Sequence, residues 1–219
     1  MIKRHCTQSG FTLVEMAIVL VIVGLMLGGL MMSLSQTRES TNRSEATAQL
    51  AEIEEALYGF AQANGFLPNP VNASGVEITA ATPARHGFIP ASALGLKGAR
   101  NANGLLIDPW NNPLRYSVTA DFAPSINKIT MTSVGTLEIW DADPASGATI
   151  IASEIPAVVL SEGKNWATST SAVGAEAQNK NANNIFVSAG YSEANFDDII
   201  TWLSGNILRT KLIAAGKLP

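Results

Sequence analysis

The sequence has almost none of the side chains on which thiol chemistry and soft-metal binding depend. Its 219 residues include one cysteine, Cys6, and two histidines, His5 and His86. Cys6 and His5 lie in the first ten residues, which we predict to be removed, so the remaining chain has no thiol and one imidazole. That excludes a disulfide, a zinc site built on several histidines, and a Cys-His pair. We therefore predict a protein that is not an enzyme, with His86 in an exposed loop.

An excess of positive charge is also missing. The chain has 14 Lys and Arg against 18 Asp and Glu, a formal net charge of -4. Loss of Lys3 and Arg4 with the first ten residues would bring the charge to -6. Such a chain does not attract phosphate backbones, so we predict no nucleic-acid binding. A content of 47% hydrophobic and 15% charged residues is typical of an ordered domain.

The longest apolar run covers residues 11–32 and contains one charge, Glu15. As a helix it would be roughly 33 Å long, enough to cross a hydrocarbon core of about 30 Å. A secretory signal has its small-residue cleavage site after the apolar run, whereas here Gly10 precedes it. Lys3 and Arg4 indicate that the chain begins in the cytoplasm. We predict a membrane helix that survives a cut at Gly10.

Glu15 is unusual within this run, because an ionised side chain at the centre of a membrane helix costs about 2.5 to 3.5 kcal/mol. A cut after Gly10 would create one nearby cation, the amino group of Phe11, on the same or on a neighbouring subunit. The alternative is that Glu15 lies at the interface of a plain membrane anchor. Gly24 and Gly28 form a G-x-x-x-G pair that permits close approach of helices.

The run from Gly10 to Glu15, GFTLVE, joined to an apolar helix resembles the prepilin cleavage motif of type IV pilins and type II secretion pseudopilins. The resemblance implies cleavage between Gly10 and Phe11, N-methylation of Phe11, and a role for Glu15 in registering subunits. Implied partners are further copies of the chain and related pilins, the prepilin peptidase and methyltransferase, an inner-membrane assembly platform, and lipid. Implied locations are the bacterial inner membrane with a periplasmic head, then a surface pilus or a periplasmic pseudopilus.

An α+β pilin-like architecture follows for the rest of the chain. Helical spacing of apolar residues predicts that the helix continues as an amphipathic segment over 33–63, packed on a β-rich head over 64–219. The apolar stripe of that segment consists of Ala46, Leu50, Ile53, Leu57 and Phe60. We predict antiparallel strands at 114–118, 128–134, 136–141, 148–152 and 156–160, long loops at 66–104 and 167–184, and a short carboxy-terminal helix ending near Ala215.

A second resemblance concerns a metal. The segment Asp108 to Tyr116, DPWNNPLRY, is similar to the entry to the sheet in pseudopilins of the major type, where we expect Trp110 and Tyr116 to be core anchors. In those proteins a loop between an S-x-G segment and an Asp-Asp-Ile segment binds calcium. The matching residues, Ser161, Asp197 and Asp198, are thereby implied as calcium ligands. The alternative is that Asp198 brackets a turn and Asp197 faces solvent, because neighbours on a strand point in opposite directions.

Two hypotheses of different class remain at this stage. The first is a structural subunit of a type IV pilus-like filament, a pilin or minor pilin for adhesion, motility or DNA uptake, with a type II secretion pseudopilin as the alternative. The second is a membrane-tethered enzyme or binding protein. Its polar pocket would be lined by Glu138, Asp141, Asp143 and Glu162.

Overall fold

The computed structural model describes residues 11–80, 82–123, 128–166, 174–192 and 195–218, with the side chains of residues 27–35 outside the description. Two compact units, Met1–Asn42 and Arg43–Pro219, divide the chain within its first helix. The described parts contain a long amino-terminal helix, mostly antiparallel sheet and a carboxy-terminal helix, which confirms the α+β class.

Helix α1 spans Leu13–Asn64, close to the predicted bounds. It ends at Gly65, whose φ of 83° is left-handed and whose amide donates to the Ala61 carbonyl at 2.7 Å, a common way for helices to terminate. Residues 11–26 are exposed. Within the described residues, no helix offers an apolar stretch long enough to cross a membrane. The predicted span 11–32 includes six residues whose side chains lie outside that description.

The core of the head is a four-stranded antiparallel sheet in the order β1-β2-β5-β7. Its strands are β1 (Ala84–Phe88), β2 (Arg115–Thr119), β5 (Ala157–Ser161) and β7 (Ile199–Trp202). One face packs against the second half of α1, where the predicted stripe is buried except for Phe60, which is half-buried. Tyr116 is fully buried on this sheet and donates to the Pro68 carbonyl at 3.1 Å, so its prediction as a core anchor is confirmed.

A second, three-stranded sheet packs on the first. Its order is β4-β3-β6, with β3 (Leu137–Trp140), β4 (Ile150–Ile155) and β6 (Ile185–Val187). β3 and β4 form the predicted hairpin around the turn at 143–147, but β6 runs parallel to β3. The predicted antiparallel pairing is thus present, and the parallel pair of β3 and β6 is a feature that was not predicted. A long connection through β4, β5 and α2 returns the chain to β3 in the same direction, which a short hairpin cannot do.

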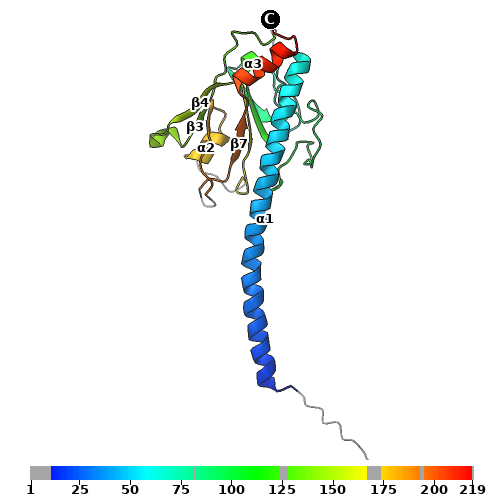
Figure 1. Ribbon diagram of the computed structural model, residues 1–219, viewed down its shortest axis with the longest axis vertical. Helices are drawn as coiled ribbons and strands as arrows, with labels where there is room; N and C mark the ends of the chain where they lie inside the picture. The colour runs from blue at the N-terminus through cyan, green and yellow to red at the C-terminus, as the bar shows by residue number, and fades with distance from the viewer. Residues whose placement is uncertain (1–10, 81, 124–127, 167–173, 193–194, 219) are drawn as a thin grey trace, which may run out of the picture. The chain divides into compact units, whose positions relative to one another are not determined.

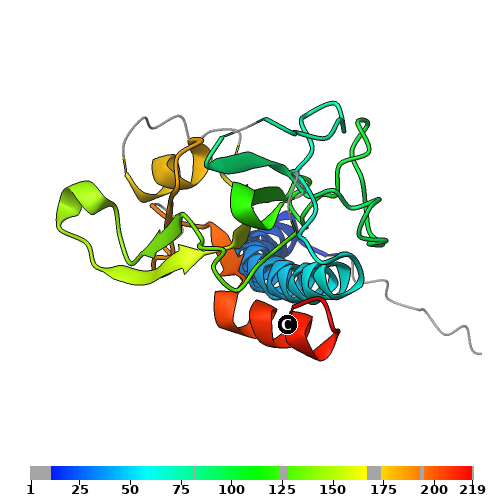
Figure 2. The same cartoon turned by 90° about the horizontal axis from the view of Figure 1, so that it is seen from above.

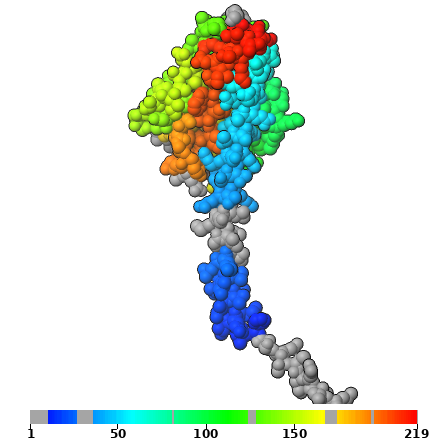
Figure 3. Space-filling model, in the orientation of Figure 1, coloured from blue at the N-terminus to red at the C-terminus, as the bar shows by residue number. Residues whose placement is uncertain are grey.

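Four short helices complete the described head. They are η1 (Ala120–Phe122), η2 (Pro144–Ser146), α2 (Ala175–Lys180) and α3 (Gly205–Ala214). α3 lies beside the last turns of α1 (Figure 2). Both helices are exposed on the face of the head that Figure 3 shows. Leu208 and Leu212 of α3 are buried, and Lys211 forms an ion pair with Glu55 of α1 at 3.0 Å.

Three predictions about the head are wrong. Residues 128–134 form no strand, and no hairpin turn follows at Gly135, where a Cβ would lie 2.2 Å from the Glu154 carbonyl oxygen. The loop predicted at 66–104 contains β1, and His86 on that strand is half-buried with its Nδ1 2.9 Å from the Ser117 hydroxyl. The loop predicted at 167–184 contains α2 (Figure 1), and residues 167–173 lie outside the description.

Candidate functional site

The first turn of α1 places Glu15 against Thr12. Glu15 Oε2 accepts hydrogen bonds from the Thr12 amide and the Thr12 hydroxyl, both at 2.9 Å, while the Glu15 amide donates to Thr12 Oγ1 at 3.2 Å. This reciprocal pair is a capping box, with threonine at the N-cap and glutamate three residues later. The T-x-x-E pattern in the sequence carries this signal, which the analysis of charge alone missed. Glu15 thus has a local partner before any amino group is released at Phe11.

The other assembly residues are placed only in part. Gly24 lies on α1, and apart from the backbone of the helix itself no atom of the described residues lies within 4 Å of the position a Cβ would take. Gly28 is helical but falls among residues whose side chains are outside the description, and Gly10 lies outside it altogether. Cleavage at Gly10, methylation of Phe11 and close helix approach at Gly24 and Gly28 remain predictions.

A cluster of carboxylates lies within the head where several loops meet. Four of its members are almost fully buried, with exposures of 1% to 6%, and Glu176 on α2 is half-buried. Two members flank the ends of strands, since Glu162 directly follows β5 and Asp198 directly precedes β7. The cluster consists of Asp108, Glu162, Glu176, Asp197 and Asp198.

Three of these carboxylates converge. One oxygen each from Glu176, Asp197 and Asp198 lie within 4.8 Å of one another. The alternative in which Asp197 faces solvent and the two aspartates diverge is therefore wrong. The Lys164 and Asn165 amides donate to Asp197 Oδ2 at 2.7 and 3.1 Å and hold that carboxylate inward.

Burial sets the electrostatics of the cluster. It raises the pKa of Asp198 to about 8, with a smaller opposing effect from the Asn179 amide that donates to Asp198 Oδ2 at 2.8 Å. Burial also raises the pKa of Asp108 and that of Glu162, although Arg115 forms an ion pair with Glu162 at 3.0 Å. Glu162 Oε2 is buried and has no hydrogen-bond partner among the residues that the structure describes. Several negative charges in such a site need protons or a cation.

The residues fit a hard divalent cation. Ca²⁺ binds oxygen ligands at about 2.3 to 2.6 Å, so ligands on opposite sides of one ion are about 5 Å apart. The Glu176, Asp197 and Asp198 oxygens all lie within 4.8 Å of one another, which is compatible with this span. A bound Ca²⁺ would offset two of the three negative charges of the converging carboxylates and hold α2 to the segment before β7.

The structure adds one carboxylate to the predicted ligand set, and Ser161 stays a prediction. The Ser161 hydroxyl donates to Asp108 Oδ2 at 2.5 Å and accepts from the Gly163 amide at 3.2 Å. Glu176 was missed, because its segment is rich in small polar residues and has no periodicity. Its signal is the single acidic side chain in the first turn of α2.

Arg43 of α1 contacts the chain next to the carboxylate cluster. Its Nη1 donates to the Asp197 carbonyl at 3.1 Å, and its guanidinium lies 3.9 Å from the centre of the Tyr191 ring. A guanidinium over an aromatic face is a favourable contact of about 0.5 to 2 kcal/mol. The segment that carries Asp197 is thereby attached to the long helix.

The position of Gly163, beside Asp197 of the carboxylate cluster, leaves no room for a side chain. Its φ is 60°, and a Cβ would lie 2.5 Å from Asp197 Cγ. We expect Gly163→Ala to lower the melting temperature by more than Gly147→Ala. Gly147 has a similar φ of 81° but open space around it, so its change costs only the left-handed strain of about 1 to 2 kcal/mol. Equal losses, measured by calorimetry, would show that the contact with Asp197 is unimportant.

Three of the four carboxylates named for the polar pocket of the rival hypothesis, Glu138, Asp141 and Asp143, make local hydrogen bonds. Asp141 Oδ1 accepts from the Thr149 amide at 2.7 Å, and Asp143 Oδ1 caps η2 by accepting from the Ala145 amide at 3.1 Å. Glu138 accepts from the Trp140 indole at 3.1 Å. Each of these carboxylates thus has a local role in the β3–β4 hairpin.

Comparison with known proteins identifies the amino-terminal segment. Residues 6–31 match the family described as the prokaryotic N-terminal methylation motif. This is the prepilin-type signature of type IV pilins and pseudopilins, and it supports a precursor of that general kind. No curated protein and no solved structure matches the chain.

Proposed function

We propose that the protein is a structural, non-enzymatic subunit of a type IV pilus-like filament. It is made as a prepilin, cut after Gly10, methylated at Phe11 and polymerised through α1. The observation that carries the proposal is the methylation motif at residues 6–31, which ends within a helix of 52 residues. Related pilins, the peptidase and methyltransferase, and an inner-membrane assembly platform are its proposed partners.

The surface of the first turns of α1 supports this proposal. Large apolar side chains between Phe11 and Met26 have exposures from 44% to 86%. Exposure of such an apolar surface to water is unfavourable. Either lipid or the helices of neighbouring subunits would cover it. We propose that residues 11–32 span the inner membrane before assembly, with the head in the periplasm, and form the helical core of the filament afterwards.

A type II secretion pseudopilin is the second candidate. The observation that favours it is the convergence of Asp197 and Asp198 with Glu176, in the segment whose likeness to pseudopilins implied calcium. Deletion of the gene separates the two candidates. Loss of surface filaments with normal protein secretion supports the pilus, and accumulation of secreted proteins in the periplasm supports the pseudopilus.

Maturation is tested by mass spectrometry of the protein purified from its own membranes. We expect an amino terminus at Phe11 that carries one added methyl group. Gly10→Val should leave the precursor uncut, because a branched side chain replaces the small residue at the scissile bond, whereas Ser9→Ala in the same leader should be cut normally. An intact Met1 on the unmodified protein would contradict the proposal.

A further inference from the structure

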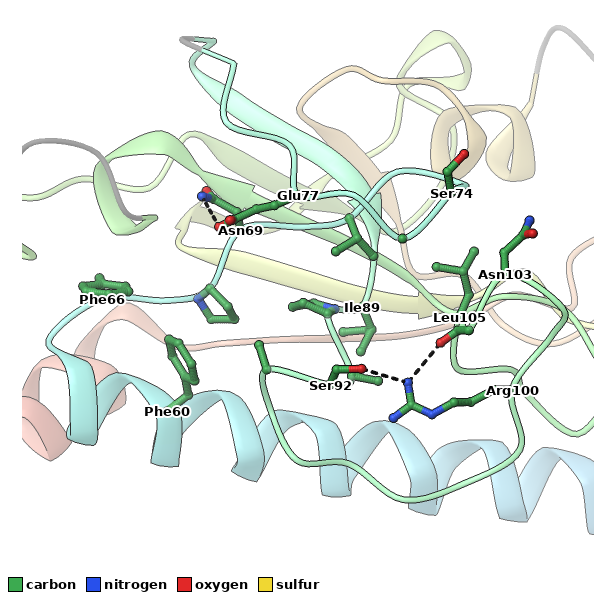
Figure 4. A pocket seen from close by; sticks show the side chains of 17 residues that line it. Phe60, Phe66, Asn69, Ser74, Glu77, Ile89, Ser92, Arg100, Asn103 and Leu105 are labelled. Carbon is green, nitrogen blue, oxygen red and sulfur yellow. Dashed lines mark hydrogen bonds between the residues drawn. The ribbon is translucent and has the colours of Figure 1, made fainter.

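A pocket of about 430 Å³ opens on the head between the end of α1 and the loops that precede β1 and β2 (Figure 4). Pro68, Ile89 and Leu105 contribute an apolar lining, and polar side chains surround it. Pockets of about 300 to 1,000 Å³ with this mixture are the usual size for small-molecule sites. None of the residues that line it belongs to the methylation motif or to the carboxylate cluster.

Two loops of matching sequence and geometry form one wall of this pocket. They are NASGV, residues 72–76, and NANGL, residues 101–105. In each loop the asparagine Oδ1 accepts from the amides two and four residues later, at 2.9 to 3.0 Å. In each, the glycine amide also donates to the asparagine carbonyl at 2.9 Å. The third side chains, Ser74 and Asn103, line the pocket, so two rigid turns present polar groups to one space.

A buried relay fixes a carboxylate at the rim. Arg85 and Asn69 are 4% and 3% exposed. Arg85 Nη1 donates to Asn69 Oδ1 at 2.7 Å, and Asn69 Nδ2 donates to Glu77 Oε1 at 2.7 Å. Linked hydrogen bonds with a charged member strengthen one another in a buried setting. The exposed Glu77 carboxylate is thus held in one position as an acceptor.

Arg100 is fixed in a similar way elsewhere on the rim. Its Nη1 donates to the Gly104 carbonyl and its Nη2 to the Leu96 carbonyl, both at 3.0 Å. Carbonyls orient the guanidinium without cancelling its charge. With Glu77 the pocket therefore has one charge of each sign and no net charge. At the end near α1, the Phe60 and Phe66 rings meet edge to face with centres 6.0 Å apart.

We propose that this pocket binds a neutral sugar, as a mono- or disaccharide unit of a glycan. A sugar ring offers apolar C–H faces together with hydroxyls that both donate and accept. The apolar lining and the phenylalanines suit the C–H faces. Planar carboxylate, amide and guanidinium groups, here Glu77, Asn103 and Arg100, offer the paired donors and acceptors that adjacent hydroxyls require.

An extended peptide fits this site less well. Peptides that add to a sheet need a strand edge with unpaired backbone groups. Val71, at the pocket, already bridges to Glu77 on one side and to Phe88 on the other. The absence of net charge likewise offers little to a phosphate or to a polycation.

The test is saturation-transfer NMR on the full-length protein, in a detergent that has no sugar head group. The probes are lactose, N-acetyllactosamine, diacetylchitobiose and maltose, and we expect transfer to at least one of them. Glu77→Gln keeps the bond from Asn69 but removes the charge, so the Kd should rise at least tenfold. Asn103→Ala should have a similar effect. Glu52→Gln, an exposed change on α1 away from the pocket, should leave the Kd unchanged.

Three results would overturn the proposal. They are no transfer to any of the four probes, equal binding by the Glu77→Gln and Glu52→Gln variants, and capture of hexapeptides at this pocket in place of sugars. The readout does not depend on cleavage or polymerisation. Failure of the filament proposal and failure of the sugar proposal are therefore separately visible.

Discussion

At pH 8, 1 mM calcium should raise the melting temperature of the full-length protein by about 5 to 10 °C relative to the same sample with chelator. A ligand at a hundred times its Kd stabilises the folded state by about 2.7 kcal/mol. For a chain of this size, each kcal/mol corresponds to about 2 to 4 °C. The expected site is formed by Glu176, Asp197 and Asp198, whose oxygens converge within 4.8 Å.

The calcium effect should shrink as the pH falls. The pKa of Asp198 is about 8 in the folded chain, against an ordinary value of 3.8. Between these values the folded state holds a proton that the unfolded state has released, so stability without calcium falls as the pH rises from about 4 to about 8. At pH 5 calcium must displace that proton. We therefore expect a small calcium response at pH 5 and a large one at pH 8.

Asp198→Asn gives the matched test. The amide is neutral at every pH, so this variant should lose most of the calcium response and most of the decline in stability between pH 5 and pH 8. Asp121→Asn, an exposed aspartate in η1, should behave like the unmodified protein. A melting temperature at pH 8 that is the same with calcium and with chelator would rule out the metal site. So would a full calcium response in Asp198→Asn.

Loss of the Glu15 side chain should reduce filament incorporation by at least tenfold while the precursor is still cut. Glu15→Ala removes both the charge and the capping hydrogen bonds from Thr12. Loss of a cap alone costs about 1 kcal/mol, too little to prevent a long helix from forming. The larger expected effect is loss of the charge that would pair with the methylated amino group of Phe11. Immunoblots of sheared filaments and of membranes measure incorporation and cleavage separately.

Glu15→Gln separates the two roles of this residue. Glutamine at the third helical position keeps a capping box but carries no charge. If the charge registers the subunits, Glu15→Gln should assemble as poorly as Glu15→Ala. Assembly at the level of the unmodified protein would show that Glu15 acts only as a cap in the first turn of α1.

The amino-terminal half was predictable because its signals are local. The apolar run and the helical spacing both lie within residues that are close in sequence, and the observed end of α1 at Asn64 is one residue from the predicted one. The buried stripe from Ala46 to Leu57 follows from the same periodicity. Phe60 departs from it because a pocket opens beside the last turns of the helix.

The head was harder to predict because its strands pair over long distances. β1, with the sequence ARHGF, has little β-branched character and becomes a strand through pairing with β2. The parallel pairing of β6 with β3 has no local signal either. Asp197 and Asp198 were found by resemblance to a known segment, whereas Glu176 joins them only through the path of the chain between β5 and β6. The matched NASGV and NANGL loops were visible in the sequence as a short repeat.

The contact between Arg43 and the Asp197 carbonyl has a practical consequence for fragments of this protein. Arg43 is the first residue of the compact unit Arg43–Pro219. A fragment or a proteolytic product that begins before Arg43 keeps the contacts of its guanidinium with the Asp197 carbonyl and the Tyr191 ring. It also keeps the buried Ala46 and Leu50. A fragment that begins one helical turn later loses these Arg43 contacts although every strand is still present. A shortened chain should therefore begin before Arg43, even though no strand requires it.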